Sequence, residues 1–271
     1  MKKSNVYFYI IMGIIAPMNN ISKQPLRASS KSMTKYWWTL AAGAILITLG
    51  IIFLTVGKKG TITMQIPLMQ TTIYIDQKDK RVTTKENESV EVKLSPSTHN
   101  IIVSRNGYYP WTKNVSVPRG KTVPLFPIFV PLNSSGQIIT TNDPEYVKIK
   151  NSITGDKTPT KSAPLVSQDK TVSIWLEGGE IMAKVAATET EAEKTFSVVA
   201  PQSPIRNVDF YKDRSDSVIF STEKAVYVIE VEAEGTQNFM PLFMGEAPAF
   251  KKVDANSMYV ADGATLMQVI I

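Results

Sequence analysis

The sequence predicts an all-β protein outside one N-terminal transmembrane helix. Residues 36–56 form an apolar stretch of about 21 residues without a charged side chain. At a rise of about 1.5 Å per residue, such a helix spans a bilayer core of about 30 Å. Beyond it, short runs of alternating apolar and polar residues recur between turn residues, which is the pattern of antiparallel strands. A buried helix of a soluble protein fits poorly, because its polar stripe would consist of Thr39, Thr48 and Thr55 alone.

Both ends of the apolar segment carry residues typical of a membrane interface. Tyr36, Trp37 and Trp38 lie at one end, where amphipathic rings favour the headgroup region. Lys58 and Lys59, between two glycines, close the other end. We therefore expect membrane lipid to be a partner of the chain.

The distribution of basic residues predicts the topology of the anchor. Four of them lie shortly before the segment and two directly after it, namely Lys23, Arg27, Lys31 and Lys35, then Lys58 and Lys59. Because basic flanks stay in the cytoplasm, we expect residues 1–35 inside and the chain from residue 60 outside the cell membrane. A cleaved signal peptide is the alternative, but its apolar region is shorter, so we expect an uncleaved single-pass anchor.

The first 35 residues leave two interpretations open. Residues 6–16 are apolar but too short to cross a bilayer, and Pro17 ends them, which is consistent with a short interfacial helix. Alternatively, translation starts at Met33, directly before the anchor.

Residues 60–132 have the pattern of a small antiparallel sandwich. Five runs have strand character, at residues 61–66, 72–75, 89–94, 100–103 and 113–117. The predicted turns between them lie at residues 76–79, 95–98 and 118–120, which are rich in Asp, Ser, Pro and Gly.

The motifs in this region resemble the PEGA domain, a small β-sandwich module of bacterial and archaeal surface proteins. The matching positions are Tyr74, Ile75, Asp76, Leu94, Pro96, His99, Gly107, Tyr108, Pro110 and Trp111. The sequence departs from the family at Pro67-Leu68-Met69-Gln70, where the name-giving motif stands, and at Ser97, where a glycine is usual. We expect these residues to be structural, with Trp111 and Tyr108 closing one end of the core and Asp76 accepting backbone N–H groups of the following turn.

The remainder divides into a linker and a repeat domain. Residues 133–167, rich in Thr, Pro, Lys and Asn, predict a linker or extended segment. Residues 168–271 contain three similar hairpins, at 172–185, 218–229 and 258–270, whose aromatics Trp175, Phe220 and Tyr259 recur at nearly the period of a propeller blade. This part weakly resembles WD40-type or TolB-type blades. Three blades cannot close a ring of at least four, so we expect an incomplete propeller or a sandwich.

Composition narrows the function classes. The net charge is +6, but Lys and Arg are scattered, so we expect no nucleic-acid partner. Cysteine is absent, which excludes disulfides and thiolate metal sites.

Catalytic candidates are few. The one histidine, His99, is predicted to lie in a turn with a structural role, and we expect no Ser-His-Asp set around it. Asp209, Asp213 and Asp216 are spaced for a loose Ca²⁺ site, but we interpret them as turn acids because Lys212 and Arg214 stand among them. Glu177, Glu180 and Asp209 are the nearest candidates for a carboxylate-based glycan hydrolase.

We therefore expect an extracytoplasmic β-rich module of the cell envelope, without cofactor or enzymatic activity, that engages a surface protein or cell-wall polymer. A glycan hydrolase and a receptor or sensor remain alternatives. The apolar C-terminal run at residues 265–271 would be an exposed sheet edge unless another strand covers it. We expect residues 146–150, residues 194–199 or a second chain to cover this edge.

Overall fold

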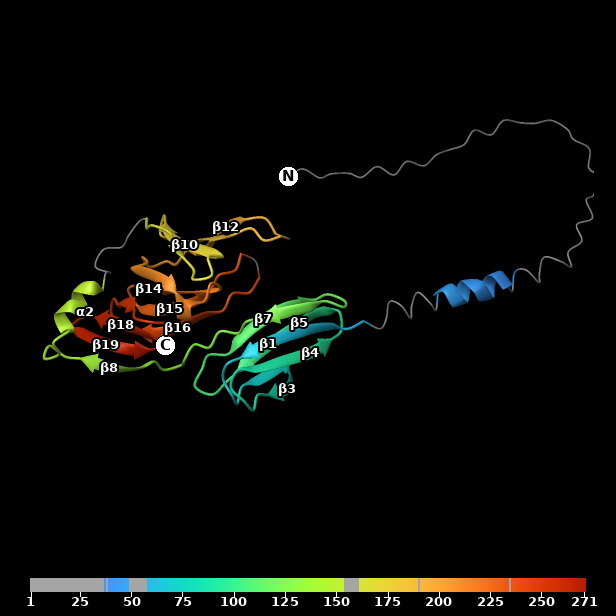
Figure 1. Ribbon diagram of the computed structural model, residues 1–271, viewed down its shortest axis with the longest axis horizontal. Helices are drawn as coiled ribbons and strands as arrows, with labels where there is room; N and C mark the ends of the chain where they lie inside the picture. Colours follow the sequence, from blue (N-terminus) through green and yellow to red (C-terminus); the bar gives the residue numbers. More distant parts are fainter. Residues whose placement is uncertain (1–36, 38, 49–57, 154–160, 190, 234) are drawn as a thin grey trace, which may run out of the picture. The chain divides into compact units, whose positions relative to one another are not determined.

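The chain forms two units, Met1–Gly57 and Lys58–Ile271. The structure is a computed structural model, and it describes residues 37, 39–48, 58–153, 161–189, 191–233 and 235–271. Within the described part of the second unit, all regular structure is β-strand except the helix α2 (Tyr146–Ser152) and the short 3-10 turn η1 (Tyr211–Asp213). The all-β prediction for this part of the chain is confirmed (Figure 1).

The first unit contains a helix over residues 39–48 with exposed apolar side chains, among them Leu40 and Leu46. No helix among the described residues is both long and apolar enough to cross a membrane. Residues 49–56 of the predicted anchor lie outside the described residues, as do Tyr36, Trp38 and the segment 1–35. Trp37, Lys58 and Lys59 are exposed.

The N-terminal part of the second unit is a sandwich-like pair of sheets. One sheet has the order β4-β1-β7 and the other the order β3-β2-β5-β6. Their strands are β1 (Gly60–Ile66), β2 (Thr72–Ile75), β3 (Lys78–Val82), β4 (Glu88–Leu94), β5 (Ser97–Ser104), β6 (Trp111–Val117) and β7 (Thr122–Leu125). Alternate residues of both sheets meet in one core, including Ile62, Met64, Ile73, Ile101 and Trp111.

All five strands predicted for the sandwich are present, and the alternation that predicted them is the alternation of buried and exposed side chains. The turn predicted at residues 76–79 is shorter than expected. Asp76 and Gln77 alone make it, with positive φ values of 52° and 63°, and β3 begins at Lys78. We did not predict β7, which pairs with β1 in parallel and contains Pro124.

The C-terminal part consists of three four-stranded antiparallel sheets. The first has β9 (Leu165–Val166), β10 (Val172–Glu177), β11 (Glu180–Val185) and β12 (Lys194–Val199). The central sheet has β13 (Asn207–Phe210), β14 (Ser217–Ser221), β15 (Ala225–Glu230) and β16 (Phe239–Met244). The C-terminal sheet has β17 (Ala249–Lys252), β18 (Ser257–Asp262) and β19 (Thr265–Ile270), with β8 (Ser135–Ile139) at its edge. All three predicted hairpins are present.

The two middle strands of the central sheet are buried on both faces. Every residue of β14 is buried, and successive residues alternate between two cores. Val218 and Phe220 pack with the first sheet, whereas Ile219 belongs to the core that contains the C-terminal sheet. The nearly continuous apolar runs of β14 and β15 therefore reflect a strand pair covered on both sides.

The C-terminal strand is covered by the chain itself, but by a segment that we did not predict. β19 pairs along its free edge with β8, from Leu266 opposite Ile139 to Ile270 opposite Ser135. The expectation of residues 146–150 or 194–199 was wrong, because these form α2 and β12. β8 lies within the predicted linker, and Gly136 is needed there because a Cβ atom would collide with the backbone of Gln268.

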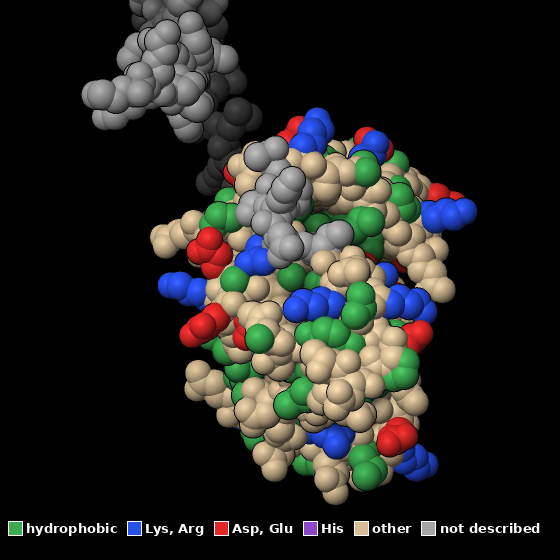
Figure 2. Space-filling model, turned by 90° about the vertical axis from the view of Figure 1, so that its left-hand side faces the viewer, with side chains coloured by type: hydrophobic (Ala, Val, Ile, Leu, Met, Phe, Trp, Pro, Cys, Tyr) green, Lys and Arg blue, Asp and Glu red, His purple; other side chains and the backbone are tan. Residues whose placement is uncertain are grey.

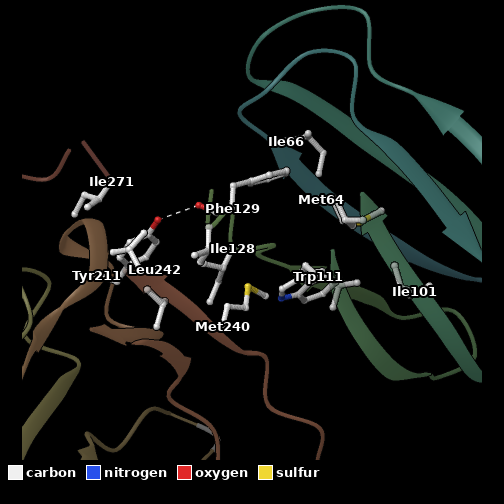
Figure 3. Close-up of a cluster of buried hydrophobic side chains, with 14 of the residues drawn as sticks. Met64, Ile66, Ile101, Trp111, Ile128, Phe129, Tyr211, Met240, Leu242 and Ile271 are labelled. Atoms are coloured by element: carbon white, nitrogen blue, oxygen red, sulfur yellow. Dashed lines mark hydrogen bonds between the residues drawn. The ribbon is translucent and has the colours of Figure 1, made fainter. Parts of the chain in front are cut away.

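A short irregular segment connects the sandwich to the three sheets. Ile128, Phe129 and Val130 are buried and join the core of the sandwich to the core between the central and C-terminal sheets. Figure 3 shows Ile128 and Phe129 between Met64 and Trp111 of the sandwich and Met240 and Leu242 of the central sheet. The Tyr211 hydroxyl donates a hydrogen bond of 2.9 Å to the carbonyl of Phe129. The two parts of Lys58–Ile271 therefore share one core, and a second core lies between the first and central sheets.

The burial of the C-terminal strand β19 predicts which of its side chains stabilise the fold. We expect Val269→Ala to lower the free energy of unfolding by about 2 kcal/mol, because this side chain is buried between sheets. The neighbouring Ile270, 53% exposed, is the matched control, and Ile270→Ala should change the free energy by less than about 0.5 kcal/mol. Urea unfolding measures both, and equal effects would show that the strand end is frayed.

Candidate functional site

The sandwich contains a Ser-His-Asp arrangement, contrary to our expectation. His99 lies on β5 rather than in a turn, and it is buried. Its Nδ1 is 2.7 Å from Oδ2 of Asp76, and its Nε2 is 2.9 Å from Oγ of Ser97. Asp76 also accepts a hydrogen bond from the backbone N–H of Asn100, rather than from the turn that follows it. The pairing of β2 with β5 brings these distant residues together.

The hydrogen bonds of His99 favour a structural role, in which the ring links two segments, over the role of a catalytic base. Its Nε2 is also 2.9 Å from the carbonyl oxygen of Ser95, which can only accept. The ionised Asp76 carboxylate can only accept as well, so these two bonds favour the form of the ring that carries a proton on both nitrogens. Burial lowers the pKa of His99, but the bonds to Ser95 and Asp76 outweigh it and raise the pKa above its usual value. A doubly protonated ring cannot remove a proton from Ser97.

This assignment predicts a pH-dependent effect of His99→Gln. A raised pKa in the folded state gives stability that is fully present below the unfolded value of about 6.5 and is lost as the pH rises through the folded value. We expect the variant to be less stable than the wild type by about 1 kcal/mol at pH 5.5, because hydrogen bonds of a charged group are lost. The difference should narrow at pH 8.5. Equal differences in denaturant unfolding at both pH values would contradict a charged His99.

The other residues of the sandwich motif have structural positions. Ile75, Leu94 and Trp111 are buried in the core. Tyr108 packs edge-on against Phe129, with ring centroids 6.0 Å apart. Gly107 has a positive φ of 83°. The remaining members are Tyr74, partly buried on β2, and the exposed Pro96 and Pro110.

A buried polar network links the sandwich to the central sheet. Glu230, at the end of β15, is 6% exposed. One carboxylate oxygen accepts a 2.7 Å bond from Trp111 Nε1, and the other accepts from Lys113 and from Asn238. Asn238 also bonds both backbone groups of Thr112. Burial disfavours the charge of Lys113, but Glu232 and Glu230 outweigh burial and raise its pKa.

Removing Glu230 should therefore disrupt the junction of the two parts. We expect Glu230→Ala to destabilise the protein by about 3 kcal/mol, because Trp111 Nε1 and the Lys113 ammonium lose a buried acceptor. Glu232→Ala removes only the more exposed partner of Lys113 and should cost less than about 1 kcal/mol. Equilibrium unfolding measures both values, and similar costs would show that Glu230 contributes no more than a surface ion pair.

Most of the carboxylates singled out in the sequence have a cationic partner. Asp209 and Asp213 both pair with Lys252, and Asp216 pairs with Arg214. Glu177 pairs with Lys161, whereas Glu180 lies across the hairpin turn from it. Over the described residues, no group of three or more His, Asp or Glu side chains is placed to hold a metal ion. Asp213 and Asp216 lie in turns, as predicted, whereas Asp209 lies on β13.

Phe126 is exposed at the junction and lines two hollows, and we call this feature the Phe126 ridge. This side chain is 57% exposed. A cleft of about 630 Å³ lies on one side, lined also by Gln168, Asp169 and Asp213. A second hollow of about 280 Å³ is lined by Phe126 together with residues that include Lys113 and Glu232.

The backbone beneath Phe126 is fixed by Arg214. The guanidinium donates to the carbonyl of Phe126 at 2.7 Å and to that of Pro127 at 3.2 Å. The same guanidinium forms two bonds with Asp216, at 2.8 and 2.6 Å. Sequence reasoning missed this site. The available signal was the prolines at positions 124, 127 and 131, because a segment that contains them cannot be a central strand and is expected to be irregular.

Charges of both signs are interspersed on the surface that Figure 2 shows. Over the described part of that face, Lys and Arg side chains alternate with Asp, Glu and hydrophobic ones.

Comparison with protein-family models and with curated proteins finds no match to this chain.

Proposed function

We propose that the protein is a single-pass, membrane-anchored binding module whose β-rich part lies outside the cell and engages a component of the cell envelope without catalysis. The observation that carries this proposal is the exposed, fixed Phe126 between two hollows at the junction of the sandwich and the sheets. Such a preformed feature suits binding, because little conformational freedom is lost when a ligand is held.

The anchor and the architecture support the same proposal. Residues 36–56 precede the β-rich unit directly and carry no charge. We infer a PEGA-like sandwich followed by three propeller-like blades in an open stack, since each C-terminal sheet has four antiparallel strands. Glu177 pairs with Lys161 and Asp209 with Lys252, which favours binding over the hydrolase alternative, because a glycosidase needs two carboxyl groups free to act on one bond.

Membrane insertion can be tested on the full chain. We expect the protein to resist alkaline extraction from membranes and to lose a C-terminal tag when intact cells are treated with protease. Replacing Leu46 and Ile47 with arginine should release the protein from the membrane fraction, because each charge costs about 3 kcal/mol at the centre of a span. Leu46→Ile with Ile47→Leu is the matched control. Retention of the tag in intact cells would reverse the proposed topology.

Binding can be tested by capture. The full chain, solubilised in detergent and immobilised, should enrich a specific envelope protein or polymer over a control that carries residues 1–59 only. Equal recovery on both surfaces would contradict a binding function.

A further inference from the structure

We infer that the Phe126 ridge is a binding site for an extended, uncharged polysaccharide. The inference rests on the proposed binding function and names its ligand class and its site. Three features of the ridge support the inference. They are the exposed ring, the hydrogen-bonding groups that line the hollows, and the partners of the charged side chains in that lining.

The ring is exposed on a backbone that is held in place. Phe126 keeps most of its surface in water, whereas large apolar side chains of the surrounding core are buried. Its backbone is held by Arg214 and stands between Pro124 and Pro127, whose φ angles are fixed. An exposed aromatic face held in this way can stack against the C–H face of a sugar ring. Stacking then costs little ordering of the protein.

The two hollows beside the ring are lined by hydrogen-bonding groups. Gln168, Asp169 and Ser215 line the larger one, and Lys113 and Glu232 line the smaller one. Because Phe126 and Asp216 belong to both, the hollows are neighbours along one surface. A ligand that covers the ring and enters both hollows is therefore a chain rather than a single sugar.

The charges in these hollows already have partners. Asp213 pairs with Lys252, Asp216 with Arg214, and Lys113 with Glu230 and Glu232. Asp169 accepts from the hydroxyls of Ser167, Thr171 and Ser215 and from the backbone N–H of Thr171, and these bonds lower its pKa. Carboxylates keep further acceptor sites for ligand hydroxyls, because each has about four lone-pair positions. Every other charged side chain named here thus has a partner of opposite charge, and the Asp169 carboxylate is held by neutral donors. A lining that offers hydrogen bonds but no free cation fits a neutral polyhydroxylated ligand.

A peptide or an anionic polymer fits these features less well. An extended peptide is usually recognised by a sheet edge and side-chain pockets, and the ridge is an irregular segment. An anionic polymer would meet the carboxylates of Asp169, Asp213 and Glu232.

The experiment measures binding of the full chain in detergent micelles to a panel of probes. The probes are hexamers of N-acetylglucosamine, of β-1,4-linked glucose and of α-1,4-linked glucose, with a galacturonate hexamer and a lysine-rich peptide as charged comparisons. Calorimetric titration should show saturable binding of at least one neutral hexamer and weaker or no binding of the charged probes.

Variants then assign the site. Phe126→Ala should weaken binding by about tenfold, whereas Phe126→Trp should retain it, because the larger ring preserves the stacking face. Val147→Ala, which shortens an equally exposed apolar side chain on α2, should change nothing. Since Phe126 is exposed, all three variants should keep the thermal unfolding of the wild type.

Several results would overturn the inference. Preference for the charged probes, absence of binding to every neutral hexamer, or full binding by Phe126→Ala would each do so. If the capture experiment still recovers an envelope protein, the proposed function stands and only the polysaccharide site fails. If capture also fails, the binding function itself is wrong.

Discussion

The shared core around Ile128, Phe129 and Val130 is the contact on which the rest of the structure depends. A sandwich of this size buries only about 60% of the surface that its unfolded chain exposes, which leaves a marginal core. The three C-terminal sheets are likewise too few for a closed ring. By packing against the same three residues, each part completes the other. The function we propose uses this junction, since the Phe126 ridge lies directly before the shared segment.

The polar network around Glu230 adds orientation to this apolar contact. Hydrophobic burial is non-directional, so it brings the parts together without fixing how they are turned. Trp111, Lys113 and Asn238 bind the same carboxylate, and Asn238 also holds Thr112. A buried carboxylate with several donors tolerates few alternative arrangements, because every lost bond leaves a buried polar group unpaired. The network therefore keeps the two hollows in a defined relation to Phe126.

Local features were predictable because they depend on neighbours in sequence. The strand alternation around Ile62 and Ile101, the three C-terminal hairpins and the structural role of Trp111 all follow from side-chain period and turn chemistry. The composition of the apolar segment at residues 36–56 is also a property of the sequence alone.

Tertiary structure decided what depends on distant partners. β8 reads as a linker because Ser135 and Gly136 are turn residues, and only pairing with β19 makes them a strand. The register of β2 with β5 brings Asp76 next to His99. Arg214, which is distant from Phe126 in the sequence, holds the backbone of Phe126. Phe126 itself lies among residues that are buried in the core. Its side chain is exposed because the neighbouring sheets do not cover it. Such contacts form when long loops close around a common core, and their energies are not encoded in any local pattern.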